Sequence, residues 1–335
     1  MDHDHHEALW RAFPADLPAF EERFSTEEAC RQYLMQCRWG DTPRCARCDH
    51  DQLWTERAGT LFQCASCGHQ TSLTSGTLFH RTRKPLKLWF RAIWEVCVHR
   101  NGISAADLKR ILGLGSYETA WTWLHRIRRA FVRPGREPLR GATQLDETFV
   151  KGCEDDKTIV LVAVEEGGRV RLVHAPGNHE DCIKHAVDTE VGNGARVKTD
   201  GHAAYNTATL GAREHDAKVQ TKAQKNADGD HLQLCHWSAS GLKRWLLGTH
   251  YGAVSAKHLQ SYLDEYVFRY NRRKTKGVGR LVARCLEMMV SIAPLTKVQL
   301  IRDTNPCRSF DSVSYCLLAE LSGFGLFGLG GQAAA

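Results

Sequence analysis

Two pairs of cysteines near the start of the chain constrain its fold more than any other feature. Two residues separate the cysteines within each pair and fifteen separate the pairs; the four are Cys45, Cys48, Cys64 and Cys67. This spacing is typical of a zinc ribbon, in which two turns supply four thiolates to one tetrahedral Zn²⁺ ion. A module of this size has almost no core, so the metal supplies its folding free energy. We therefore predict a structural zinc site and expect catalytic chemistry elsewhere.

The composition bounds the class of protein. A chain of 335 residues can form two or three domains, and a net charge of +7 favours a polyanionic partner. The other cysteines lack the spacing of a disulfide framework, which fits a reducing cytosol. The chain opens without an apolar signal region, and no apolar run approaches the roughly 20 residues of a membrane span. We therefore predict a cytoplasmic protein with no membrane partner.

The first 133 residues divide into three predicted modules. Residues 1–40 are predicted to be helical, with Ser25 and Glu28 spaced as a capping box. Residues 41–80 form the zinc ribbon. Residues 81–133 contain three helical patterns, and the last two, joined by a Gly-containing turn, predict a helix-turn-helix.

The last of these helices is rich in arginine. We expect three of its side chains to contact DNA phosphates: Arg126, Arg128 and Arg129. The alternative is an ordinary helical hairpin with a basic face in solvent.

An α/β pattern follows a linker at residues 134–138. Strands are predicted at 142–151, 158–165, 169–174 and 195–200, with a fifth at 217–221. A helix is predicted between the third and fourth strands, at 179–191, and the chain is helical from about residue 232. Short turns between the first three strands predict an antiparallel start to a mixed sheet with flanking helices.

Two aspartates lie at informative places in these strands. Asp146 is inside the first strand, and Asp200 is at the carboxyl end of the fourth. If the two strands are neighbours, the carboxylates can share a divalent cation, Mg²⁺ or Mn²⁺. Glu147 should point to the opposite face of the sheet. The alternative is a pair of solvated residues at strand ends.

The whole order of segments resembles bacterial insertion-sequence transposases of the family numbered 1595. After the zinc ribbon and the helix-turn-helix, the resemblance rests on LDETFV at 145–150, KTDGHAAYN at 198–206, LKRWLLGTH at 242–250 and LQSYLDEYVFRYNRR at 259–273. It covers about residue 20 to 285. It implies a ribonuclease-H-like catalytic domain of the DDE class at residues 140–285. It also implies excision and insertion of a DNA element by phosphodiester hydrolysis and strand transfer.

The same resemblance implies a set of site residues. Asp146 and Asp200 match the first two acidic positions of the family, and the third falls on His236, seven residues before Lys243. Most DDE enzymes have Glu at the third position. A neutral imidazole can ligate Mn²⁺ or Mg²⁺, and a preference for Mn²⁺ is the expected consequence. Lys243 would contact DNA, and Asp230 is a weaker alternative to His236 as the third ligand.

The implied partner is double-stranded DNA, both the terminal inverted repeats of the element and the target. Because a transposase joins two DNA ends, a dimer or higher assembly is expected, and Arg272 and Arg273 would follow backbone phosphates. Two alternatives stay open: an inactive DNA-binding relic that His236 marks, or a zinc-ribbon transcription regulator with an unrelated α/β domain. Residues 286–335 form a tail for which the sequence predicts no function.

Overall fold

The computed structural model describes residues 3–40, 42–56, 60–151, 157–175, 177–252 and 254–302. Most of the predicted tail, residues 303–335, lies outside the described residues. The first part of the chain contains helices and a small sheet: α1 (His3–Arg11), α2 (Leu17–Arg23), α3 (Glu27–Trp39), β1 (Leu53–Glu56), β2 (Leu61–Cys64), β3 (Gln70–Ser72), α4 (Leu86–Val98), α5 (Ala105–Leu112) and α6 (Tyr117–Ala130).

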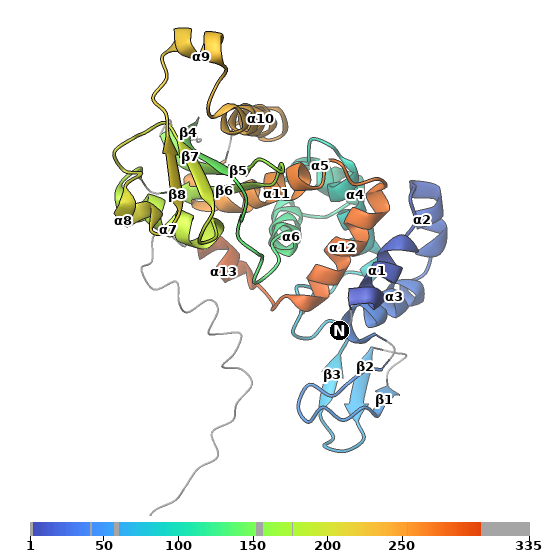
Figure 1. Ribbon diagram of the computed structural model, residues 1–335. Coiled ribbons are helices and arrows are strands. Elements are labelled where there is room, and N and C mark those ends of the chain that lie inside the picture. Colours follow the sequence, from blue (N-terminus) through green and yellow to red (C-terminus); the bar gives the residue numbers. More distant parts are fainter. Residues whose placement is uncertain are drawn as a thin grey trace, which may run out of the picture.

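A larger sheet and its helices form the second part. Its elements are β4 (Thr143–Lys151), β5 (Lys157–Glu165), β6 (Val170–Ala175), α7 (Glu180–Glu190), β7 (Arg196–Thr199), α8 (Thr207–Leu210), β8 (Glu214–Ala217), α9 (Lys222–Asp228), α10 (Gln233–His250), the 3₁₀ turn η1 (Ala256–His258), α11 (Leu259–Asn271), α12 (Val278–Ser291) and α13 (Lys297–Arg302). In Figure 1 the zinc-ribbon sheet hangs below the helices, and α9 projects beyond the opposite end of the larger sheet.

Side-chain caps fix where the early helices begin. The hydroxyl of Ser104 accepts the backbone N–H of Asp107, and the hydroxyl of Ser116 accepts that of Thr119. The predicted capping box at Ser25 is wrong by one residue. The structure begins α3 after Thr26, whose hydroxyl accepts the Ala29 N–H at 3.1 Å.

One hydrophobic core joins the early helices to α12, near the end of the described residues. Phe20, Phe90 and Ile127 are buried in it together with Leu286 of α12. Phe62 of the small sheet joins the same core and meets the Trp39 ring edge-on at 5.0 Å between centroids. The chain therefore returns from the larger sheet to complete the helical layer in which it started.

The larger sheet has the strand order β6-β5-β4-β7-β8. β4, β5 and β6 pair antiparallel, whereas β7 lies parallel to β4, and β8 lies parallel to β7. This is the ribonuclease-H-like arrangement, and it makes the first and fourth strands neighbours as the aspartate pair requires. The predicted fifth strand is displaced: β8 spans Glu214–Ala217 rather than 217–221. Its polar, exposed edge residues carry no apolar alternation for a sequence pattern to detect.

Alternate residues of β5 face two different helical layers. Val160, Val162 and Val164 are buried against α10 and α11. Leu161 and Ala163 are buried with residues of α7 on the other face. A strand covered on both faces reads as a continuous apolar run, as the sequence has here.

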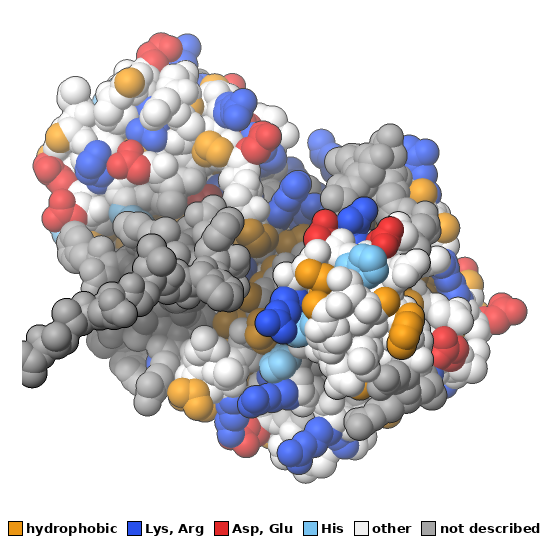
Figure 2. Space-filling model, turned by 90° about the horizontal axis from the view of Figure 1, so that it is seen from below, with side chains coloured by type: hydrophobic (Ala, Val, Ile, Leu, Met, Phe, Trp, Pro, Cys, Tyr) orange, Lys and Arg blue, Asp and Glu red, His pale blue; other side chains and the backbone are white. Residues whose placement is uncertain are grey.

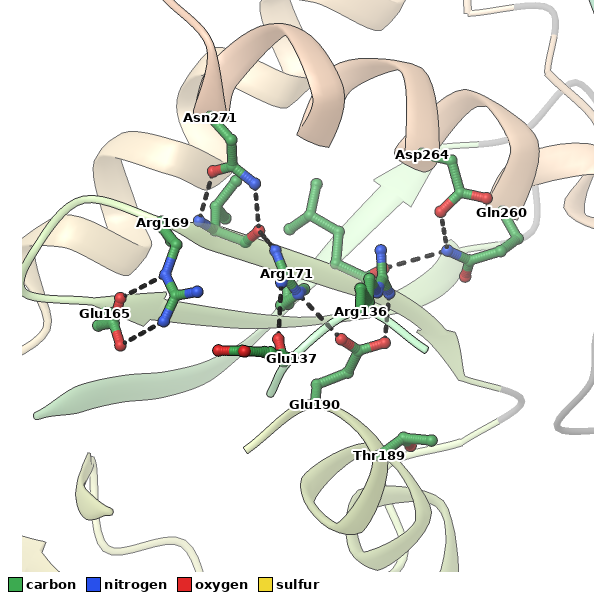
Figure 3. A network of polar contacts seen from close by, with 12 residues as sticks. Arg136, Glu137, Glu165, Arg169, Arg171, Thr189, Glu190, Gln260, Asp264 and Asn271 are labelled. Atoms are coloured by element: carbon green, nitrogen blue, oxygen red, sulfur yellow. Dashed lines mark hydrogen bonds and ion pairs between the residues drawn. The ribbon is translucent and has the colours of Figure 1, made fainter. Parts of the chain in front are cut away.

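The edge strand β6 is closed by side chains of α11 rather than by another strand (Figure 3). The Asn271 amide accepts the Val170 N–H at 2.7 Å and donates to the Val170 carbonyl at 3.0 Å. Gln260 does the same three turns earlier, accepting from the His174 N–H at 2.9 Å and donating to the Leu172 carbonyl at 3.1 Å. Exposed strand edges invite pairing with other chains, and these amides occupy this one.

Within the described residues, no helix combines the length and apolar character that crossing a membrane requires.

Candidate active site

The strand β4 places Asp146 on the face of the sheet that α10 covers. Its cross-strand partner is Val162, which is buried in the core beneath α10. The Asp146 side chain is 18% exposed, and its Oδ1 accepts the Glu147 backbone N–H at 2.9 Å. Burial raises the pKa of this carboxyl, and the negative charge of Asp200 adds to the effect, while His236 opposes it. Asp146 is thus a partly desolvated carboxylate whose ionised form needs a cationic partner.

Glu147 faces the other side of the sheet, as alternation along the strand requires. It pairs with Leu161, which is buried in the α7 layer, and burial raises its pKa. It therefore does not share a face with Asp146.

Asp200 directly follows the last residue of β7, beside β4. Its Oδ1 accepts the His202 N–H at 2.9 Å, which holds the exposed carboxylate at the end of the strand. Gly201 makes the sharp exit from the strand with φ +80°, a value that favours glycine. The parallel pairing therefore brings the end of β7, where Asp200 follows, next to the strand of Asp146, and the charge of Asp200 contributes to raising the pKa of Asp146.

His236 lies in the first turns of α10 and faces Asp146. Its Nε2 is 3.3 Å from Asp146 Oδ2. Its Nδ1 is in direct contact with the Asp230 carboxylate, just before the helix. An imidazole held at one nitrogen presents the other in a fixed direction, here toward the strand.

Gln144 fixes the start of α10 on the sheet. Its side-chain oxygen accepts the backbone N–H groups of Leu234 at 2.9 Å and Cys235 at 3.3 Å. The helix has no side-chain cap of its own, so Gln144 satisfies N–H groups that would otherwise lack partners. Because Gln144 and Asp146 are two residues apart, they share a face. The residue that anchors α10 therefore also sets the distance between Asp146 and His236, a role that sequence reasoning missed.

Asp230 is itself held in place. Its Oδ1 accepts the Leu232 N–H at 3.2 Å and lies 3.6 Å from Lys225 Nζ on α9. Burial opposes ionisation of this carboxyl, but the His236 contact outweighs it and lowers the pKa. The structure thus places Asp230 behind the imidazole rather than beside Asp146 as a competing ligand.

The side chains of Asp146, Asp200 and His236 are of the types that bind a divalent cation, but they do not all lie close enough together to bind one ion at once. A carboxylate oxygen and an imidazole nitrogen face each other across 3.3 Å, and a second carboxylate lies on the adjacent strand. Such mixed oxygen and nitrogen donors suit Mn²⁺ and, less well, Mg²⁺. In the described part of the chain, however, the only group of three or more potential ligands with all atoms within 4.8 Å is the cysteine cluster.

Lys243 is exposed on α10, seven residues after His236. Seven residues are close to two helical turns, so both side chains leave the helix on the same side. Trp237, next to His236, is 61% exposed, which is unusual for so large a ring.

The four ribbon cysteines converge as their spacing predicts. The Sγ atom of Cys48 lies 3.5 Å from that of Cys64 and 3.4 Å from that of Cys67. The Sγ atoms of Cys45 and Cys67 are 3.7 Å apart. A tetrahedron with Zn–S bonds of about 2.3 Å has edges of about 3.8 Å. The cluster is therefore ready for one zinc ion without rearrangement.

The arginine-rich half of α6 is turned inward. Arg128 is 1% exposed, lies 2.8 Å from a Glu265 carboxylate oxygen, and stacks on the Tyr262 ring. The expectation that Arg128 meets phosphates is wrong, because its guanidinium joins α6 to α11. Arg126 and Arg129 are half-buried and donate to backbone carbonyls, of Leu78 and Val132 respectively.

The two arginines after α11 differ in exposure and in what they contact. Arg273 is exposed and donates to the Gly168 carbonyl at 3.2 Å. Arg272 is half-buried and lies over the Phe268 ring at 4.3 Å.

Comparisons with known proteins agree with this geometry. Residues 134–271 match the family described as ISXO2-like transposase domain, and residues 25–70 match the transposase zinc-ribbon domain. The chain is 25% identical over 279 residues to an uncharacterized protein in transposable element ISH50 of Halobacterium salinarum, covering 73% of this chain and 91% of the relative.

Among solved structures, a chain of the simian T-cell lymphotropic virus intasome in complex with the PP2A regulatory subunit B56 gamma is similar at 17% identity with a TM-score of 0.26. The match covers 48% of this chain and 61% of that one, and it is too weak to add to the assignment. The first domain match ends at Asn271, the last residue of α11.

Proposed function

The chain belongs to the ISXO2-like transposases with an N-terminal zinc ribbon, and from this premise we propose that it moves a DNA element. In this function it binds the terminal repeats of the element, hydrolyses phosphodiester bonds at their ends, and joins the freed 3′-hydroxyl to target DNA. The joining step forms a bond between the element 3′-oxygen and a target phosphorus and releases the target 3′-hydroxyl, so one phosphodiester replaces another and no external energy source is needed. The observation that carries the proposal is the approach of His236 to Asp146 at 3.3 Å beside the strand that ends in Asp200.

Each residue of the site has a distinct part in this chemistry. Asp146 and Asp200 hold divalent cations from adjacent strands, and His236 supplies the third ligand through Nε2. When bound, the divalent cations activate the attacking oxygen and stabilise the leaving oxygen. Asp230 acts through His236 as a positioning residue, because its contact with Nδ1 leaves Nε2 free to ligate.

Other parts of the chain bind DNA in this proposal. Lys243 contacts a backbone phosphate on the His236 side of α10, as a point charge. The exposed Trp237 ring, next to His236 in the sequence, offers a surface on which an unpaired base at a cleaved end can stack. The zinc ribbon carries a second exposed ring, Trp54, which is 65% exposed. Joining two ends requires at least two copies of the chain on the DNA.

The test is strand transfer of a labelled, pre-cut element end into plasmid DNA, with Mg²⁺ and Mn²⁺ in separate reactions. We expect joining by the wild type, with Mn²⁺ more effective, and loss of at least about 10³-fold in Asp200→Ala and His236→Ala, the scale of removing a group that acts directly on the reacting atoms. Exposed Lys184→Ala on α7 serves as the control and should keep wild-type joining.

One observation favours a second function, binding of DNA without catalysis. Asp200 is not within ligand distance of both Asp146 and His236 among the described residues, and His236 replaces the Glu of most DDE enzymes. An inactive copy binds element ends but joins none with either metal. A zinc-ribbon regulator with an unrelated α/β domain would also join no ends and would be indifferent to substitution of Asp146 and Asp200. Strand transfer therefore separates the transposase from both alternatives, and specific binding of element ends separates the inactive copy from the regulator.

A further inference from the structure

A hollow of about 650 Å³ lies between α12, the segment after α6 and the segment after α11. Its lining gathers four arginines and a single carboxylate: Arg133, Arg272, Arg280, Arg284 and Glu287. No residue of the candidate active site lines it. Seen from below, Lys and Arg side chains border the hollowed middle of the molecule (Figure 2).

The helix α12 builds one wall of the hollow with its polar face. Arg280 and Arg284 are four residues apart and project together toward the hollow. The opposite face of the helix carries Val282 and Leu286, which are fully buried in the first core. Like charges at this spacing destabilise a helix unless an anion lies between them. The core therefore holds a repulsive pair in place.

The charges in the hollow are not balanced by the protein. The single carboxylate, Glu287, is 3.3 Å from Arg284 and accepts the Trp10 indole N–H at 3.1 Å. For Arg133, Arg272 and Arg280, no carboxylate of the described residues lies within ion-pair distance. The hollow thus has a surplus of three positive charges.

Among these arginines, Arg272 is the one whose burial most disfavours its positive charge. It lies over the Phe268 ring, and burial lowers the pKa of its guanidinium to about 10, with a further contribution from Arg284. Taking a cation out of water without a partner is unfavourable, and a bound anion offsets this cost. Arginine forks match the oxygens of a phosphate in two hydrogen bonds each.

We propose that this hollow binds the phosphodiester backbone of duplex DNA at a second contact, apart from the candidate active site. The proposal rests on the proposed function. It places the DNA against α12 and the segments that follow α6 and α11. The arginines come from three separate segments and open to solvent, which suits a continuous backbone better than a small enclosed anion. The side chains of Trp10 and Leu281 add an apolar surface against which the deoxyribose rings of the backbone can pack.

The experiment measures binding of a labelled duplex by fluorescence anisotropy at several salt concentrations. The variant is Arg133→Gln with Arg280→Gln, because both side chains are exposed and hold no described partner, so folding is preserved. The matched control removes two exposed arginines elsewhere, Arg100→Gln with Arg140→Gln. We expect the variant to bind at least about tenfold more weakly and its salt slope to fall by about 2, since each phosphate contact contributes about 0.9. The control should change neither quantity comparably.

A second arm titrates the wild type with pyrophosphate by calorimetry, to separate a DNA backbone from a free anion. Equal slopes for variant and wild type overturn the proposal, and pyrophosphate binding that the variant alone loses would then identify a small-anion site. Strand transfer is measured on the same proteins. A slope effect without any metal-dependent joining supports the hollow and rejects the proposed function. A wild type that binds no duplex rejects both.

Discussion

At the scale of single residues, the proposed function requires His236 to act in place of a carboxylate, and its neighbours favour this role. An imidazole can present either nitrogen, whereas a carboxylate offers two equivalent oxygens. Asp230 removes this ambiguity by contacting Nδ1, and Gln144 fixes the helix that carries the ring. Where most DDE enzymes have Glu, this chain has His236, and the loop before α10 supplies the Asp230 carboxylate that contacts its ring.

Asp230→Asn is expected to weaken Mn²⁺ binding about 10- to 100-fold, the scale on which partners behind a metal ligand act. The amide is neutral, so it no longer stabilises the ring orientation or its basicity as the carboxylate does. Calorimetric titration with Mn²⁺ on zinc-loaded protein measures this directly, without an activity assay. Asp228→Asn on α9, exposed and without a described contact, is the matched control. Equal affinities for Asp230→Asn and the wild type would leave Asp230 as a loop residue only.

At the scale of elements, the zinc ribbon has two ends of different character. The end near β2 and β3 is anchored in the helical core through Phe62 and Leu73. The other end contains the cysteine knuckles, where the buried side chains of the described residues are Cys45 and Cys64. Zinc is therefore needed to fold only the part of the ribbon that contains the cysteine knuckles, whereas the sequence alone suggests that zinc folds the whole module.

Removal of zinc is expected to unfold the knuckles while the helical core stays folded. Hydrogen exchange of Cys48→Ser should show lost protection within residues 45–70, with protection of α3 and α4 retained and less than one zinc per chain. The knuckles have no apolar packing that could replace the metal–thiolate bonds. Cys182→Ser, a buried cysteine of α7 outside the cluster, should retain zinc fully. Global loss of protection in Cys48→Ser would show that the core anchors are insufficient.

The helix α11 serves as a partner for the edge strand, and this role can be measured. In Asn271→Ala the Val170 N–H and carbonyl lose both bonds, so we expect a loss of about 1–3 kcal/mol in the free energy of unfolding. Urea unfolding measures the change, and exchange of the Val170 amide should rise. Asn226→Ala, exposed on α9, is expected to have no effect. A similar small change for both variants would mean that water replaces the amide at this edge.

At the scale of the whole molecule, the sequence predicts the elements better than their assembly. The four cysteines and the strand pattern follow from local spacing, whereas the position of Asp146 beside Asp200 depends on the pairing of β4 with β7, which the sequence left as a condition. The inward turn of Arg128 does not follow from local spacing either, because its partner Glu265 lies 137 residues away. The return of α12 to the first core is equally invisible to local patterns, and so are the arginines that it brings to the hollow. Charged residues on an amphipathic helix are read as solvent-facing unless the contact that buries them is known.

The buried cluster of Arg128, Glu265 and Arg269 joins the helical layer to the α11 layer, and it should govern the acid stability of the chain. Burial alone would raise the pKa of Glu265, but Arg269 and Arg128 outweigh it and lower the pKa to about 2. A lowered pKa stabilises the fold above the unfolded value of about 4.5, and the contribution is lost as pH falls from there toward 2. Glu265→Gln leaves the buried Arg128 guanidinium without its anion and removes one partner of the half-buried Arg269, so it should cost about 3–5 kcal/mol at pH 7.

Urea unfolding at pH 7, 5, 4 and 3 checks this, with exposed Glu22→Gln as the control. The stability difference between the wild type and Glu265→Gln should be constant down to about pH 4.5 and then shrink, because below that pH Glu265 takes up a proton in the unfolded state while it stays ionised in the folded state. Glu22→Gln should follow the wild type throughout. A difference that stays constant to pH 3 would mean that the loss arises from packing rather than from charge. In that case the link between the two layers would be steric, and Arg128 could be replaced by an apolar residue without loss.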